Sequence, residues 1–173
     1  MSRVESHSIE GLARAVIDAA AAKHLMVATA ESCTGGLIAA ALTDIAGSSA
    51  VVDRGFVTYS NEAKQDMLGV TPSDLLKFGA VSSEVATAMA MGALERSRAA
   101  CTVSVTGIAG PGGGSAQKPV GLVYIATANA LGTRVEKCLF ADTHEAHTRQ
   151  AVREVTVSTA LKMLLESMSS LSQ

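Results

Sequence analysis

The stretch Thr29–Gly36 (TAESCTGG) gathers side chains that could act as nucleophiles. It holds the hydroxyls of Ser32 and Thr34, the thiol of Cys33 and a carboxylate, directly before two glycines. Apolar runs on both sides predict a strand-to-helix turn, where the first backbone N–H groups of the helix are unpaired and attract negative charge. Those groups can hold a phosphate or an oxyanion. Taken alone, the stretch favours the plainer interpretation that Ser32 or Thr34 caps the helix.

Cys33 has two interpretations of its own. It could be a small buried residue, or a thiolate whose pKa is lowered by the end of the helix.

A serine nucleophile needs a base, and Lys64 is the best candidate. It follows a predicted strand that could lie beside the first one, and the carboxyl ends of neighbouring parallel strands meet in one crevice. Partial desolvation can move a lysine pKa from about 10.4 toward neutrality, and Tyr59 could relay or orient the proton. A solvated Lys64 paired with Glu62 or Asp66 is the alternative, somewhat favoured by the sequence alone.

The histidines are weaker candidates. His144 and His147 flank Glu145 at a spacing that metal ligands could use, but no third ligand stands out, so a solvated first helical turn is favoured. His7 and His24 lie at the ends of the first predicted helix. We expect no metal.

The segment Thr106–Ser115 is rich in glycine and follows a predicted strand. Lys118 lies too late for a phosphate-binding Walker loop, and the segment leads into a strand instead of a helix. It predicts either a flexible connector or a loop that lies flat against a ligand. Ser48 is a further hydroxyl that could bind substrate, act as a rival nucleophile or end the preceding helix.

The remaining pattern predicts the elements that position these residues. Helices are expected at 8–22, 35–45, 61–69, from 71, at 82–98 and at 143–167, and strands at 25–30, 55–60, 101–106, 120–128 and 133–140. Helices between strands predict an α/β fold, and the late antiparallel hairpin predicts a mixed sheet. We expect a single three-layer α/β/α domain over 1–173, with a frayed tail from about Ser167.

Composition limits the function classes. The chain has 173 residues, of which 48% are apolar and 17% charged, as in a globular domain. Its net charge of -2 and its lack of Trp predict no nucleic acid partner. Three widely spaced cysteines, no signal-peptide pattern and no membrane-spanning run predict a reduced, cytoplasmic protein without membrane contact.

Five motifs in this order, AESCTGG, TDIAGSSA, GFVTYSNEAK, GAVS and TGIAGPGGGS…KPVG, resemble the C-terminal domain of the competence/damage-inducible CinA family. The resemblance runs from about Ile9 to Leu164. Stand-alone members of that family are nicotinamide-nucleotide amidases. The molybdopterin-binding-like domain of full-length members has no counterpart here, so its activity is expected to be absent.

The resemblance implies hydrolysis of nicotinamide mononucleotide (NMN) to nicotinic acid mononucleotide and ammonia, without metal or cofactor. It implies Ser32 as nucleophile and Lys64 as general base, with Tyr59 and Thr106 in support. An acyl-enzyme would form, and backbone N–H groups around Thr34–Gly36 would stabilise its oxyanion. Arg149 and the Gly110–Ser115 loop are the expected phosphate anchors. The expected substrate-binding residues are Thr34, Gly35, Gly36, Ser48, Thr106, Gly107, Gly110 and Arg149.

Two alternatives stay open at this point. The domain could bind a pyridine nucleotide as a sensor without turnover, or Cys33 could be the nucleophile of a thiol amidase. The sequence also leaves a homo-oligomer open.

Overall fold

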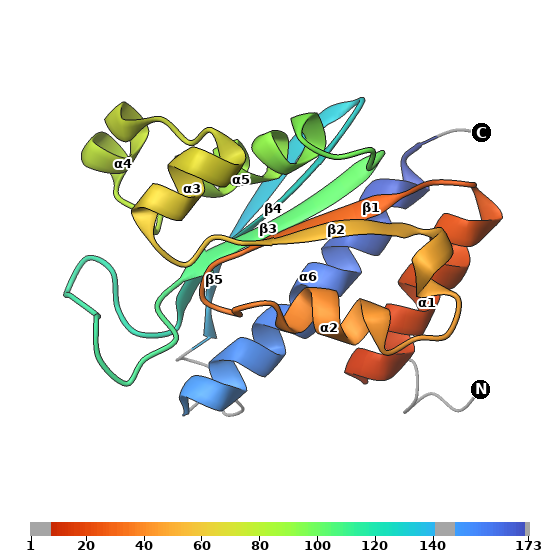
Figure 1. Ribbon diagram of the computed structural model, residues 1–173. Helices are drawn as coiled ribbons and strands as arrows, with labels where there is room; N and C mark the ends of the chain where they lie inside the picture. Colours follow the sequence, from red (N-terminus) through yellow and green to blue (C-terminus); the bar gives the residue numbers. More distant parts are fainter. Residues whose placement is uncertain (1–7, 141–147, 172–173) are drawn as a thin grey trace.

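The computed structural model describes residues 8–140 and 148–171, which form a five-stranded sheet covered by helices on both faces (Figure 1). The strands are β1 (Val27–Glu31), β2 (Val52–Val57), β3 (Cys101–Gly107), β4 (Leu122–Asn129) and β5 (Gly132–Leu139). The helices are α1 (Ile9–Ala22), α2 (Leu37–Thr43), the 3₁₀ turn η2 (Ser48–Ala50), α3 (Asn61–Leu68), α4 (Pro72–Phe78), α5 (Ser83–Glu95) and α6 (Arg149–Ser169).

The strand order is β2-β1-β3-β4-β5. The first three strands are parallel, whereas β4 and β5 form an antiparallel hairpin at the edge. The expected mixed sheet and α/β class are therefore confirmed. Parallel pairing brings the carboxyl ends of β1, β2 and β3 to one edge of the sheet, which is where the candidate chemistry lies.

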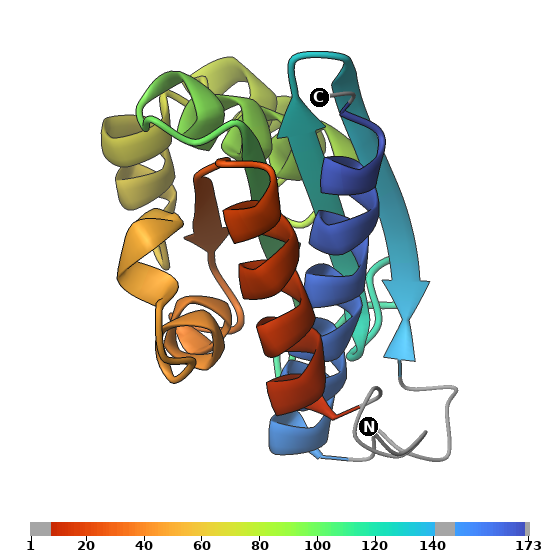
Figure 2. The same ribbon diagram turned by 90° about the vertical axis from the view of Figure 1, so that its right-hand side faces the viewer.

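Three layers are visible in the ribbon. Figure 1 shows α3, α4 and α5 on one face of the sheet and α1, α2 and α6 on the other, and Figure 2 shows α1 and α6 side by side. The larger apolar core lies between α1, α2, α6 and the sheet. The other face packs small residues of α5 against the sheet, and buried hydroxyls of β3 tie the helix down: Thr102 donates to Ala90 O and Ser104 to Ala86 O.

Several expected boundaries were wrong. The second strand spans Val52–Val57 instead of 55–60, since its first residue pairs with Val27 at the start of β1. Helix α2 begins at Leu37 because Gly35 and Gly36 adopt left-handed backbone angles, with φ of 62° and 99°, that form a turn and not a helix.

The last helix extends two residues beyond its expected end at 167. Helix α6 continues to Ser169, and Asn129 Nδ2 donates to Ser167 O at 3.0 Å. Lys23 Nζ donates to the carbonyls of Met168 and Leu171. These contacts hold the last turn of α6 against the body of the protein. Within the described residues, no helix is long and apolar enough to cross a membrane.

Candidate active site

A cavity of about 230 Å³ opens at the carboxyl edge of the parallel strands. Its walls come from the segments after β1, β2 and β3, from α3, from the α4–α5 connection and from α6. The lining residues are Ser32, Cys33, Tyr59, Asn61, Lys64, Ala80, Val81, Thr106, Gly107, Ala109 and Arg149.

Ser32 and Lys64 meet in this cavity. The backbone N–H of Ser32 donates to Val105 O at 3.1 Å, which fixes the residue just beyond the end of β1. Lys64 reaches it from α3, which is capped by Ser60. Lys64 Nζ lies 3.1 Å from Ser32 Oγ. Ser32 and Lys64 lie far apart in the sequence, and the parallel pairing of β1 and β2 brings them together in space.

Lys64 is buried, with 1% of its surface exposed. Nζ donates to the carbonyls of Thr58 at 2.9 Å and Tyr59 at 3.3 Å. Desolvation lowers the pKa of Lys64, because burial penalises the ammonium form. Nζ also lies 3.5 Å from Ser60 O. A neutral amine has two N–H groups and one lone pair, so in that form Nζ can donate to two of the three carbonyls and turn its lone pair to the Ser32 hydroxyl.

A residue without an assigned role in the sequence analysis, Glu31, organises the turn. Its carboxylate is fully buried and accepts hydrogen bonds from the N–H groups of Gly36, Ile38 and Ala39 at 2.9–3.0 Å. The Thr34 hydroxyl also donates to it, at 2.6 Å. Glu31 therefore caps α2 from inside the protein, and neither Ser32 nor Thr34 is the cap.

This arrangement corrects the expected oxyanion donors. The N–H of Gly36 is bound to Glu31, and the N–H of Gly35 donates to Ser32 O at 3.1 Å. The N–H groups of Cys33 and Thr34 find no acceptor on another residue in the described parts of the chain. The N–H of Cys33 lies against the thiol of its own residue.

Cys33 lines the same cavity, but its surroundings disfavour ionisation of the thiol. Burial raises the pKa of its thiol to about 11, and the negative charge of Glu31 acts in the same direction. The thiol is therefore protonated at neutral pH, which opposes the thiolate interpretation.

Tyr59 and Arg149 stand at the mouth of the cavity. Arg149, in the first turn of α6, donates to the Tyr59 hydroxyl at 3.2 Å and to Gly110 O at 2.9 Å. The Tyr59 side chain is largely exposed, and its hydroxyl contacts Arg149 and not Lys64. The expected proton relay through Tyr59 thus has no contact to support it, whereas its backbone carbonyl does bind Lys64.

The residues expected from the glycine-rich segment contribute to the site in different ways. Thr106 lines the cavity, but its hydroxyl donates to Ala80 O and so fixes the wall of the cavity. A Cβ on Gly107 would lie 2.7 Å from the Val123 side chain, so only glycine fits at the end of β3. Gly110 supplies the carbonyl that holds Arg149.

Ser48 was wrongly expected at this site. It lies in η2, before the amino end of β2, whereas the cavity lies at the carboxyl end. Its hydroxyl donates to Thr43 O at the end of α2.

Among residues 8–140 and 148–171, no group of three or more His, Cys, Asp or Glu side chains could hold a metal ion. His7, His144, Glu145 and His147 lie outside the described residues.

Sequence reasoning also missed Arg153, whose Nη2 donates to Thr34 O at 2.9 Å and so holds the turn from α6. Its position four residues after Arg149, on the same face of a helix, was the available signal.

Comparison with known proteins gives a consistent result. The family model described as "CinA C-terminal domain" matches residues 9–168. The chain is 50% identical over 155 residues to the nicotinamide-nucleotide amidohydrolase PncC of Escherichia coli K12, covering 88% of this chain and 90% of the relative. It is 55% identical over 132 residues to the PncC protein of Enterobacter agglomerans, covering 76% and 78%.

Other relatives are longer. The match to a CinA-like protein of Geobacter sulfurreducens has 52% identity and covers 82% of this chain but only 33% of that protein. The chain spans about a third of the length of several such curated relatives. The crystal structure of the competence/damage inducible protein CihA from Agrobacterium tumefaciens superposes with a TM-score of 0.88 at 58% identity, covering 93% of this chain and 95% of that chain. The chain therefore belongs to the CinA C-terminal domain family.

Proposed function

We propose that this chain is a nicotinamide-nucleotide amidase that hydrolyses NMN to nicotinic acid mononucleotide and ammonia. The observation that carries the proposal is the 3.1 Å contact between Ser32 Oγ and the buried Lys64 Nζ. Relatives about half identical over most of their length are named nicotinamide-nucleotide amidohydrolases, which supplies the substrate class.

The first half of the reaction follows from the geometry of Ser32. Neutral Lys64 accepts the hydroxyl proton, and Ser32 Oγ attacks the carboxamide carbon of the substrate. The carbonyl oxygen gains negative charge, and the N–H groups of Cys33 and Thr34 are the proposed donors to it, each contributing a few kcal/mol. The protonated Lys64 then delivers the proton to the leaving nitrogen. Ammonia departs and leaves an acyl-enzyme on Ser32.

The second half repeats this proton path in reverse. Lys64, neutral again, accepts a proton from a water molecule as that water attacks the acyl carbon. The protonated Lys64 then returns the proton to Ser32 Oγ, and the acid product is released. No metal or other cofactor enters this scheme, because an amine supplies the base and backbone groups bind the oxyanion.

Arg149 is the proposed phosphate anchor. It is held by Gly110 and Tyr59 and lines the same cavity as Ser32, and a guanidinium suits two-point contact with phosphate. Three unpaired cysteines, two of them buried, fit a reducing cytoplasm as the place of this reaction.

A thiol amidase based on Cys33 is less well supported, because burial raises the pKa of that thiol and the base contacts Ser32 instead. A sensing domain without turnover is distinguished by the assay.

The test is ammonia release from NMN, with nicotinamide riboside and free nicotinamide as controls. We expect NMN to be hydrolysed far faster than either control, since binding of the remote phosphate orients the amide. Dialysis against EDTA should leave the rate unchanged. Absence of ammonia release with intact NMN binding would instead favour a sensor.

A further inference from the structure

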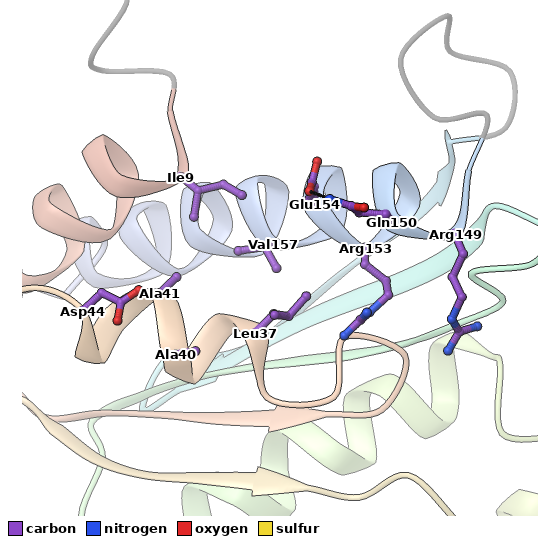
Figure 3. A pocket seen from close by; sticks show the side chains of 10 residues that line it. All are labelled: Ile9, Leu37, Ala40, Ala41, Asp44, Arg149, Gln150, Arg153, Glu154 and Val157. Atoms are coloured by element: carbon purple, nitrogen blue, oxygen red, sulfur yellow. Dashed lines mark hydrogen bonds between the residues drawn. The ribbon is translucent and has the colours of Figure 1, made fainter.

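A second and larger hollow adjoins the candidate active site, with a volume of about 590 Å³ (Figure 3). It is a groove between α2 and α6, closed at one end by the start of α1. Its lining residues are Ile9, Leu37, Ala40, Ala41, Asp44, Arg149, Gln150, Arg153, Glu154 and Val157. Neither the expected catalytic residues nor the expected Gly-rich anchor lies in it.

Arg149 lines both the groove and the catalytic cavity. The two hollows therefore share one wall, and a ligand that contacts Arg149 from the catalytic side can continue into the groove. The catalytic cavity, at about 230 Å³, is smaller than the roughly 300–1,000 Å³ typical of pockets for drug-sized ligands, whereas the groove falls within that range.

Charge varies along the groove. Figure 3 shows Arg149 and Arg153 at one end, with Asp44 at the other and apolar side chains between them. Within the described parts of the chain, neither arginine forms an ion pair with a carboxylate, and the buried Nε of Arg153 has no hydrogen-bond partner. Among the described residues, these two cationic groups, one helical turn apart, thus have no carboxylate partner.

The floor of the groove is apolar. Leu37 and Ala40 project from α2, and Ile9 and Val157 face them from α1 and α6 (Figure 3). Such a surface suits the flat face of a purine, while Asp44 and Glu154 can accept hydrogen bonds from ribose hydroxyls or an exocyclic amine.

We propose that the groove takes the second nucleotide of a nicotinamide dinucleotide. This inference rests on the proposed function, because the nicotinamide half lies in the catalytic cavity. The nicotinamide-side phosphate contacts Arg149, the second phosphate contacts Arg153, and the second nucleoside lies over the apolar floor. The dinucleotide is thus a competitor of the mononucleotide for the same site.

The experiment measures NAD⁺ in two ways. One is competition with NMN, followed by the formation of nicotinic acid mononucleotide, because NAD⁺ seated in this way can itself release ammonia; the other is calorimetric binding to the full chain. The probing variant is Ala40→Phe, because Ala40 is an exposed residue of the groove floor and contacts neither Ser32 nor Lys64. The matched control is Ala21→Phe, at an exposed position near the far end of α1.

We expect NAD⁺ to compete with NMN in the wild type. Ala40→Phe should weaken NAD⁺ binding about tenfold or more, equivalent to roughly 1.4 kcal/mol, while kcat/KM for NMN stays within about twofold. Ala21→Phe should change neither quantity.

Two results would overturn the proposal: no calorimetric binding of NAD⁺ to a chain that hydrolyses NMN, or equal NAD⁺ affinity in Ala40→Phe and the wild type. A chain that binds NAD⁺ in the groove but releases no ammonia from NMN would support the groove and refute the amidase proposal. The two claims therefore fail separately.

Discussion

At the scale of single residues, the site depends on a lysine kept out of water. A solvated Lys64 would be protonated at neutral pH and useless as a base. The structure buries it, surrounds Nζ with carbonyl oxygens and points it at Ser32. Burial alone would not activate a serine; the amine must also contact the hydroxyl, and Ser32 Oγ lies 3.1 Å from Nζ.

The pH dependence of kcat/KM follows from the lowered pKa of Lys64. Activity should rise with pH as Lys64 loses its proton, with a midpoint well below about 10.4, the ordinary lysine value. Lys64→Arg should be inactive at every pH, since a guanidinium stays protonated. Initial rates of ammonia release across pH measure both effects. An ascending limb that persists in Lys64→Arg would assign it to another group.

Arg149→Ala tests the phosphate anchor. Hydrogen bonds to charged groups contribute about 1.5–3 kcal/mol, so kcat/KM for NMN should fall roughly ten- to hundredfold. Nicotinamide riboside has no phosphate, and its slower turnover serves as the internal control for the loss of the Tyr59 and Gly110 contacts. An equal loss on both substrates would mean that Arg149 only shapes the cavity mouth.

At the scale of elements, the amino end of α2 is held by the carboxylate of Glu31, which belongs to the same short stretch of sequence as Ser32. Glu31 is the last residue of β1 and accepts three backbone N–H groups of the turn and helix. The usual helix N-terminus offers those groups to a ligand. Here they are used internally, so the oxyanion donors that we propose are the N–H groups of Cys33 and Thr34.

Glu31→Gln should destabilise the protein and slow catalysis together. In the wild type, two carboxylate oxygens share the N–H donors, whereas the glutamine side chain offers only one oxygen and turns its NH₂ group toward N–H groups. We therefore expect a loss of about 2–3 kcal/mol in the free energy of unfolding. Urea denaturation measures it. Glu84→Gln, an exposed carboxylate in the first turn of α5, is the matched control and should cost less than about 1 kcal/mol. Equal stability of the two variants would contradict the role of Glu31.

At the scale of the whole molecule, the sequence predicted the layered α/β fold and the edge where the chemistry lies. Ser32 and Lys64 could be brought together in advance because each follows a strand of a parallel pair. Ser48 could not be placed without knowing that β2 begins at Val52, which puts η2 at the opposite edge. Arg153 was missed because the face that α6 turns toward α2 depends on how the two helices pack, which local periodicity does not reveal.

Acid stability belongs to this scale, because Asp53 joins distant segments. Its buried carboxylate accepts from the backbone N–H of Arg98 and pairs with the side chains of Arg98 and Arg54. The Arg98 N–H and these partners lower its pKa to about 2. A folded pKa below the unfolded value of about 3.9 adds stability above pH 4 that is lost as pH falls toward 2. Asp53→Asn should therefore melt below the wild type at pH 7, with the difference closing near pH 2. A constant difference in melting temperature across this range would contradict the linkage.

The central claim is that Ser32 is the nucleophile of a nicotinamide-nucleotide amidase, and one comparison tests it most directly. The measurement is the initial rate of ammonia release from NMN by Ser32→Ala and Cys33→Ala, each shown to be folded by its melting curve. We predict that Ser32→Ala loses activity about a thousandfold or more, whereas Cys33→Ala keeps most of it. Substantial turnover by Ser32→Ala, or its collapse in Cys33→Ala, would contradict the account.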